Sequence, residues 1–200
     1  MRKFVFVFFS IVMFGTLVWH PSERLSAQQN TASANRTTPV EVGRKAPDFS
    51  LQDQDGQTVK LSALRGKSPV VLVFYRGSWC PFCVRQLTEL GSLAQSGENV
   101  RVLAISVDPV EENKKLAQTL AAKSGGNLTF SILSDPGHQV IDRFGLHDPA
   151  YDGKRFDGIP HPAVYVLDKA GKVTWARVEQ DYKVRPTVSE VRAALDLVKK

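Results

Sequence analysis

Cysteine is scarce in this sequence, which has two such residues among 200, Cys80 and Cys83. A single pair cannot form the dense disulfide framework of small secreted domains. It also supplies only half of the ligands of a four-cysteine zinc site. Three roles remain for the pair: a redox centre, a metal site completed by other residue types, and a structural disulfide.

Long runs of Lys or Arg are absent, although the chain has 26 basic and 20 acidic residues and a formal net charge of +6. Aromatic residues do not form a stripe beside the basic ones, as they do on many nucleic-acid-binding faces. We therefore interpret the excess charge as a basic surface and expect no nucleic-acid partner. Internal repeats are absent too, and 200 residues suffice for one well-buried domain with some chain left over.

Charge is missing altogether from the stretch Phe4–Trp19, which follows Arg2 and Lys3. A short basic region, an apolar run and then small residues before a cleavage point are typical of a secretory signal. The small residues of this chain predict cleavage after Ala27 or Ala34. An uncleaved anchor is the alternative, but sixteen apolar residues are fewer than the roughly 20 that span a bilayer.

Three segments follow from this pattern. We assign residues 1–27 to a signal peptide or uncleaved anchor, residues 28–40 to a polar, flexible linker, and residues 41–200 to one folded domain. The predicted destination is the bacterial periplasm, the cell envelope or the medium, and membrane contact is expected only through an uncleaved N-terminal segment. Outside the cytosol thiols oxidise unless a partner reduces them, so the cysteine pair is expected to form a disulfide.

Hydrophobic patterns in residues 41–200 alternate between those of strands and those of helices. Continuous apolar runs predict strands buried on both faces, as in a parallel sheet, and a late hairpin adds antiparallel strands. The predicted elements are a hairpin around Asp55-Gly56, strands at 70–75, 100–107 and 128–133, helices from Pro81, Asp108-Pro109 and Asp135-Pro136, a hairpin around 169–171, and a helix over 188–199.

Two of the predicted helices begin with capping signals. Asp108 is expected to cap the second helix, with Pro109 at the first helical position. Thr187 and Glu190 have the spacing of a capping box, in which each satisfies a backbone N–H of the other, and they open the last helix.

The cysteine pair lies where the predicted strand 70–75 gives way to a helix. Pro81 fits the first turn of that helix, which needs no backbone donor there. The free N–H groups and the dipole of a helix N-terminus stabilise a thiolate, which is the nucleophile in disulfide exchange. Because two residues separate the thiols, the second can close on the first within one turn. This setting favours a redox centre.

The other two roles fit the pair less well. A structural disulfide would close a loop too short to remove much chain entropy, so it would stabilise the fold only weakly. A metal site needs more ligands, and the four histidines are scattered along the sequence with no paired metal spacing. We therefore expect neither a bound metal nor a cofactor other than the redox-active disulfide. A metal-binding or metallochaperone protein remains the lesser alternative.

The segments "FYRGSWCPFC" and, some eighty residues later, "GIPHPAVYVLDKAGKV" resemble the thioredoxin-like superfamily. More narrowly they resemble its redoxin group, which includes the alkyl hydroperoxide reductase/thiol-specific antioxidant, or peroxiredoxin-like, proteins. The resemblance covers about residues 41–200, and its most specific element is the WCxxC motif that begins at Trp79. It implies an α/β fold with a central mixed sheet flanked by helices, to which this chain adds an N-terminal hairpin.

The resemblance leaves two alignments of the cysteines open. In the thioredoxin alignment, Cys80 is the exposed attacking thiol and Cys83 resolves the mixed disulfide. In the peroxiredoxin alignment, Cys83 is peroxidatic, Cys80 stands where a Thr is usual, and Arg76 replaces a Pro. The activating Arg that peroxiredoxins place just before the strand "AVYVLD" is missing too, because Pro162 occupies that position. These departures favour an exported thiol–disulfide oxidoreductase, with a thiol-dependent peroxidase as the alternative.

The resemblance also implies supporting residues and partners. Pro162 would be the family's cis-proline beside the active site, although it could simply begin a strand. His161 would face the cysteines and, when protonated, stabilise the thiolate; a loop histidine bonded to backbone is the equal alternative. Trp79 would contribute to an apolar rim. The expected partners are a thioredoxin-like electron donor and a protein-disulfide or peroxide substrate.

Overall fold

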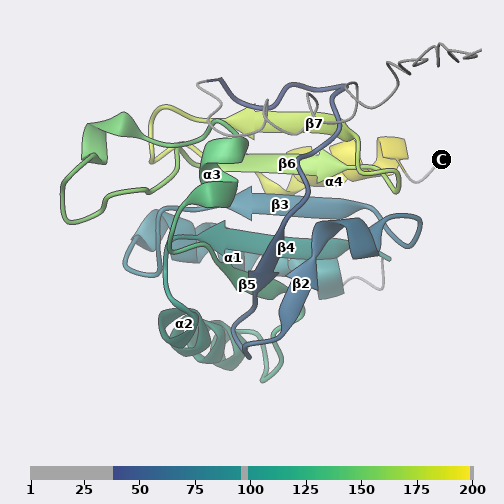
Figure 1. Cartoon of the computed structure of the whole chain (residues 1–200). Helices are drawn as coiled ribbons and strands as arrows, with labels where there is room; N and C mark the ends of the chain where they lie inside the picture. The colour runs from purple at the N-terminus through teal and green to yellow at the C-terminus, as the bar shows by residue number, and fades with distance from the viewer. Residues whose placement is uncertain (1–37, 96–98, 199–200) are drawn as a thin grey trace, which may run out of the picture. The chain divides into compact units, whose positions relative to one another are not determined.

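The computed structural model describes residues 38–95 and 99–198 (Figure 1). The predicted signal peptide or anchor and most of the predicted linker lie outside the described residues, so those two assignments stay predictions. In the part of the chain that is described, no helix is both long enough and apolar enough to cross a membrane. Val40 is already buried, one residue before the predicted start of the folded domain.

Seven strands of the described chain form one mixed sheet (Figure 1). The strands are β1 Ser50–Gln52, β2 Thr58–Lys60, β3 Val70–Phe74, β4 Arg101–Ser106, β5 Ser131–Ser134, β6 Ala163–Leu167 and β7 Val173–Val178. They lie in the order β2-β1-β5-β4-β3-β6-β7. The three middle strands β5, β4 and β3 are parallel, as the sequence predicted, and the N-terminal and late hairpins add antiparallel strands at the two edges.

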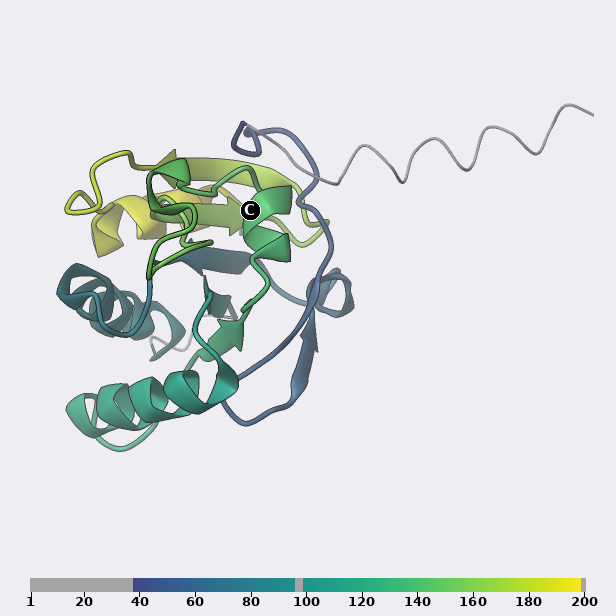
Figure 2. The same cartoon turned by 60° about the vertical axis from the view of Figure 1, so that its left-hand side comes forward.

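Helices cover both faces of this sheet. The helices of the described residues are α1 Pro81–Gln95, α2 Val110–Lys123, α3 Gln139–Arg143 and α4 Val188–Val198, with short 3-10 helices η1 Leu61–Leu64 and η2 Pro149–Tyr151. On one face, α1, α2 and α4 pack against the sheet; on the other lie α3 and the chain that precedes β1 (Figures 1 and 2). The predicted α/β thioredoxin-like fold, a central mixed sheet flanked by helices, is confirmed.

Strand β3 leads directly into the cysteine motif and is buried along its whole length. Val71 and Val73 point into the core beneath α1, α2 and α4, whereas Leu72 and Phe74 point into the core beneath α3. Successive side chains of a strand alternate between the faces of the sheet, so a strand covered on both faces needs an unbroken apolar run. The run therefore anchors the loop that carries the cysteines to the middle of the sheet.

The predicted capping signals have different outcomes. The capping box is confirmed: the Thr187 N–H donates to Glu190 Oε2 (2.8 Å), and the Glu190 N–H donates to Thr187 Oγ1 (3.2 Å). The prediction for Asp108 is wrong. Helix α2 begins at Val110 with Pro109 as its N-cap residue, and no side chain in the described part of the chain caps it. The reason is that the Asp108 carboxylate is turned toward the loop after β3, where it accepts a different backbone N–H.

Candidate active site

The loop between β3 and α1 brings the cysteines into place through one close backbone approach. Gly77 has a positive φ of +151°, which L side chains rarely adopt. A Cβ at this position would collide with the Trp79 indole and lie 3.1 Å from Asp108 Oδ1. Only glycine therefore lets the loop turn tightly beneath Trp79 before the helix begins.

Asp108 fixes the same loop from the neighbouring strand. Its Oδ2 accepts the backbone N–H of Ser78 at 2.6 Å, while its own N–H donates to Ser106 Oγ. Burial raises the pKa of the Asp108 carboxyl, and the hydrogen bond from Ser78 opposes that rise. The carboxylate thus ties the end of β4 to the loop that precedes the cysteines.

Cys80 caps the helix that Pro81 begins. Pro81 is the first residue of α1, as predicted from its missing backbone donor. The Cys80 sulfur accepts the backbone N–H of Cys83 at 3.3 Å, as the side-chain oxygen of an N-cap residue would. The two sulfurs are bonded to each other as a disulfide, so the pair closes within the first helical turn.

Neither sulfur is exposed in this disulfide form. The exposed fraction is 1% for Cys80 and 0% for Cys83, so the expectation that Cys80 is the exposed thiol is wrong for the oxidised protein. The physical reason is that the bond to Cys83 and the cap on α1 both draw the Cys80 side chain inward. Exposure therefore does not indicate which of the two sulfurs is the nucleophile. The side chains that contact each sulfur are a better guide.

Arg185 contacts the sulfur of Cys83, and this contact distinguishes Cys83 from Cys80. Its Nη2 donates to Cys83 Sγ at 3.4 Å, from the segment between β7 and α4. Its Nη1 donates to the carbonyl oxygens of Tyr182 and Val184, which hold the guanidinium in position. Burial and then the charge of Arg76 lower the pKa of Arg185 to about 10, so the group stays protonated at neutral pH. A fixed positive charge thus lies against the Cys83 sulfur.

Arg76 is a second buried guanidinium at this site, with an exposed fraction of 5%. It lies among three aromatic rings, with its Cζ atom 4.5 Å from the ring centroid of Tyr182, 4.9 Å from that of Tyr151 and 5.1 Å from that of Trp79. Cation–π attraction compensates part of the loss of hydration at such a site. Arg76 therefore contributes positive charge and also orders the aromatic side chains around it.

Aromatic rings lie around the cysteine loop, where the resemblance implied an apolar rim that includes Trp79. The Trp79 ring is stacked on Phe156, with 4.1 Å between the centroids, and 42% of Trp79 stays exposed. On the other side, the rings of Phe82 and Tyr182 meet edge to face at 5.9 Å. Two segments distant in sequence, one after η2 and one after β7, thus meet the loop that carries the cysteines.

Pro162 does not take the cis form that the resemblance implied, and its neighbour His161 lies near a carboxylate. The described residues contain no cis peptide bond, so the cis prediction for Pro162 is wrong. The trans form suits hydrogen bonds on both sides: the His161 N–H donates to the Leu146 carbonyl, and the Pro162 carbonyl accepts from the Glu179 N–H. His161 Nε2 lies 3.9 Å from Asp148 Oδ1. Because the cysteines are bonded as a disulfide, the expected role of His161 toward a thiolate stays a prediction.

Metal-ligating groups gather elsewhere in the fold. Among the described residues, the side-chain clusters with the geometry to hold a metal ion contain His, Asp or both, and neither cysteine belongs to one. In the disulfide form the two sulfurs are bonded to each other. The disulfide is compatible with the predicted redox role, and the expectation of no metal at the cysteines stays a prediction.

Sequence reasoning missed the contacts of Arg185 and Asp108 at this site. Arg185 lies in "YKVRPTVSE", where no motif distinguishes it from a surface arginine, and its partner is 102 residues away. For Asp108 the sequence predicts a different role, that of a helix cap, because an Asp-Pro pair is a common helix start. Its contact with Ser78 depends on the pairing of β3 with β4, which the local sequence does not record.

Comparisons with known proteins point to one family for most of the chain. The AhpC/TSA family matches residues 42–176. The chain is 33% identical over 136 residues to the putative peroxiredoxin bcp of Haemophilus influenzae, which covers 68% of this chain and 84% of the relative. It is 35% identical over 150 residues to peroxiredoxin Bcp of Escherichia coli, at 72% and 88% coverage.

Solved structures give the same result for the fold. The crystal structure of peroxidoxin BcpB from Mycobacterium tuberculosis has a TM-score of 0.65 and 25% sequence identity, over 80% of this chain and 97% of that one. A peroxiredoxin-like protein from Aquifex aeolicus has a TM-score of 0.69 at 19% identity, over 80% and 89%. At that identity the second likeness concerns the fold alone.

Proposed function

This chain belongs to the AhpC/TSA family of oxidoreductases, and from that membership we propose that it is a thiol-dependent peroxidase in which Cys83 reacts with the peroxide and Cys80 resolves the product. Peroxiredoxin relatives favour this function over the disulfide exchange that the sequence alone favoured. In the peroxiredoxin alignment that the sequence left open, Cys83 would be the peroxidatic residue.

The observation that carries the proposal is the contact between Arg185 and Cys83. A guanidinium beside a sulfur stabilises its thiolate and lowers the pKa of the thiol, which makes that sulfur the nucleophile. The missing Arg before β6 was one of the objections to a peroxidase, and Arg185 supplies a positive charge from another segment. Among the described residues, no group accepts from the buried Nε–H of Arg76 or of Arg185, so these donors are available for a peroxide oxygen.

The first chemical step is nucleophilic attack by the Cys83 thiolate on one oxygen of the peroxide. An S–O bond forms and the O–O bond breaks, so Cys83 is oxidised to a sulfenic acid. The other oxygen leaves as an alkoxide or hydroxide, takes a proton and departs as alcohol or water. The charge that develops on the two oxygens is stabilised by the guanidinium groups of Arg76 and Arg185.

The second step forms the disulfide that the structure contains. The Cys80 thiolate attacks the Cys83 sulfur, an S–S bond forms, and the S–O bond breaks with release of water after protonation. Because both residues lie in the first turn of α1, this step needs no unfolding of the helix. An external dithiol, expected from a thioredoxin-like protein, reduces the disulfide by exchange and is itself oxidised.

Thiol–disulfide exchange on protein substrates is the second candidate function. A disulfide closed within one turn at a helix N-terminus supports it, because the same geometry serves a dithiol reductant. In that function Cys80 would attack first. The identity of the faster-reacting sulfur therefore separates the two functions.

A pair of measurements on the reduced protein tests this assignment. The first is timed alkylation read by peptide mass spectrometry, in which Cys83 is expected to be labelled before Cys80. The second compares peroxide consumption with disulfide reduction, using the same electron donor. Faster labelling of Cys80, together with disulfide reduction that exceeds peroxide consumption, would refute the peroxidase.

We further propose that the protein is exported. Support comes from the N-terminal sequence pattern of residues 1–27, which lie outside the described residues. Cell fractionation followed by N-terminal sequencing of the mature chain tests this. Export predicts a periplasmic or secreted chain that begins at Gln28 or Asn35, or a membrane-bound chain with its N-terminus intact; an intact chain in the soluble cytosol would exclude both.

A further inference from the structure

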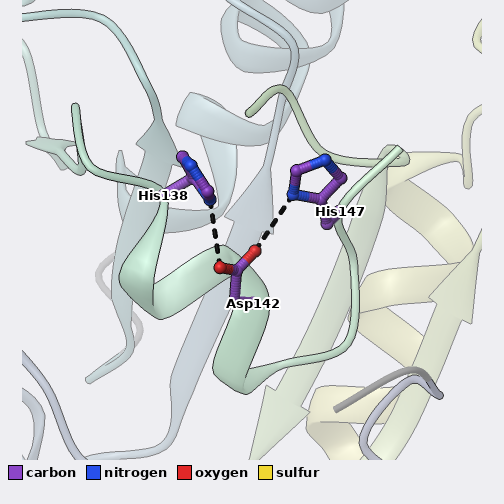
Figure 3. Close-up of side chains that lie close together, drawn as sticks. All are labelled: His138, Asp142 and His147. Atoms are coloured by element: carbon purple, nitrogen blue, oxygen red, sulfur yellow. Dashed lines mark hydrogen bonds and ion pairs between the residues drawn. The ribbon is translucent and has the colours of Figure 1, made fainter. Parts of the chain in front are cut away.

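A cluster of metal-ligating side chains lies beside α3, outside the redox site. The histidine cluster consists of His138, Asp142 and His147, which come from the N-cap of α3, from α3 itself and from the loop that follows it (Figure 3). Both imidazole rings point at the one carboxylate (Figure 3). No metal-binding spacing marks this cluster in the sequence, since eight residues separate the two histidines.

We propose that this cluster is a binding site for a divalent transition-metal ion of the Zn(II) class, with His138 Nδ1, the Asp142 carboxylate and His147 Nδ1 as its protein ligands. Two imidazoles and a carboxylate form a donor set that suits such ions. One ligand atom from each residue can be chosen so that all three lie within 4.8 Å of one another.

Distances within the cluster are close to those of a metal site. His138 Nδ1 lies 3.0 Å from Asp142 Oδ2, and His147 Nδ1 lies 3.1 Å from Asp142 Oδ1. Metal–ligand bonds of about 2.0–2.1 Å at tetrahedral angles place neighbouring ligand atoms about 3.3 Å apart. Small side-chain shifts would therefore admit an ion, and water would complete the coordination. The exposed fractions of the three side chains, from 24% to 35%, leave a path for the ion.

An outer carboxylate orients the second histidine. His147 Nε2 lies 2.5 Å from Asp152 Oδ1, on the side of the ring away from Asp142. A histidine that ligates a metal usually donates its other ring N–H to a carboxylate or a carbonyl group, which fixes both the tautomer and the ring. Asp152 occupies that position, so Nδ1 of His147 is the nitrogen left for the ion.

The backbone around the cluster is held firmly. Asp135 Oδ2 accepts the N–H groups of Val140 and Ile141, which fixes the first turn of α3. His138 has a positive φ of +43°, the one such value among non-glycine residues of the described chain. A Cβ at Gly158 would lie 2.6 Å from Cδ2 of the His138 ring, so glycine lets this neighbouring segment pack on the imidazole.

An ion in the cluster would also affect the rim of the redox site. The segment from His147 to Gly158 carries Tyr151 onto Arg76 and Phe156 onto Trp79. A bond between His147 and the ion would tie this segment to α3. The site is therefore expected to be structural: it would hold the segment that carries Tyr151 and Phe156 at the rim of the redox site.

Equilibrium dialysis against Zn²⁺ alone tests the site. The full chain is purified without a polyhistidine tag and kept in the disulfide form, so that the cysteine sulfurs stay bonded to each other. We expect one Zn²⁺ per chain at micromolar free metal. Asp142→Asn and His147→Gln are expected to abolish this stoichiometric binding. Asp152→Asn is expected to weaken it about 10- to 100-fold, the usual effect of removing an outer carboxylate.

Two further variants keep the result decisive. His138→Asn removes a ligand but suits the left-handed backbone, which Asn tolerates well, so it is expected to fold and to lose binding. Asp157→Asn is the matched control, an exposed carboxylate near His147 that the proposed site does not use, and binding is expected to persist. Absence of binding by the unmodified chain, binding retained in folded variants of all three ligands, or binding lost in Asp157→Asn would each overturn the site.

Discussion

Arg185 and Cys83 are 102 residues apart in the sequence, yet Nη2 of the arginine lies 3.4 Å from the sulfur of the cysteine. The segment after β7 brings the guanidinium there, and the carbonyl oxygens of Tyr182 and Val184 hold it. This contact distinguishes two cysteines that are equally buried and bonded to each other. In the proposed peroxidase, Arg185 would take the place of the arginine that is missing before β6.

Removal of the Arg185 charge is expected to slow peroxide reduction. Arg185→Gln leaves the Cys83 thiolate without its cation, so the pKa of that thiol should rise and the rate at neutral pH should fall about 100-fold, as for other lost anion-stabilising donors. Stopped-flow peroxide consumption and the pH dependence of Cys83 alkylation measure both effects. Arg177→Gln, an exposed arginine of β7, is the control; equal losses in the two variants would contradict the role of Arg185.

Single cysteine variants should give opposite chemical outcomes. Cys80→Ser keeps the peroxide-reacting sulfur but removes the resolving one, so a sulfenic acid should accumulate at Cys83 after one turnover. Cys83→Ser should consume almost no peroxide. Trapping with a sulfenic-acid reagent, followed by intact-mass spectrometry, measures sulfenic acid formation in both variants. A sulfenic acid at Cys80 in the Cys83→Ser variant would reverse the assignment.

Asp108 should make the stability of the protein depend on pH. Burial raises the pKa of its carboxyl above the value in the unfolded chain, so the folded state favours the protonated form. The stability that protonation contributes is present below about pH 4 and is lost as the pH rises through the raised pKa. The Asp108→Asn variant has no carboxyl to deprotonate, so it does not lose this stability as the pH rises. Urea unfolding from pH 4 to 7 should therefore show the variant gaining stability relative to the unmodified protein, and a constant difference would argue against it.

Gly77 should tolerate no side chain. In Gly77→Ala the new Cβ would collide with the Trp79 indole, which we expect to reduce the free energy of unfolding by about 1–3 kcal/mol beyond the backbone strain. Gly56→Ala is the matched control, since Gly56 also has a positive φ but has open space around it. Denaturant unfolding compares the two variants. Equal destabilisation would mean that the collision is relieved at little cost.

The sequence by itself determined the elements whose signals are local. The unbroken apolar run of β3, Pro81 at the start of α1 and the capping box of Thr187 and Glu190 all act within a few residues, and the structure confirms each. Burial of a strand on both faces and satisfaction of helix-end N–H groups are local requirements, so their residue patterns are readable. The mixed sheet and the position of the cysteines at a helix N-terminus followed from them.

Only the tertiary structure decided which residues surround the cysteines. The contact of Arg185 with Cys83, the turn of Asp108 toward Ser78 and the pairing of His161 with Asp148 each depend on how loops from different strands meet. The meeting of two histidines at Asp142 is of the same kind. Such contacts leave no periodicity in the sequence, because a charged side chain in a loop has the same local pattern whether it faces solvent or a thiol 102 residues away.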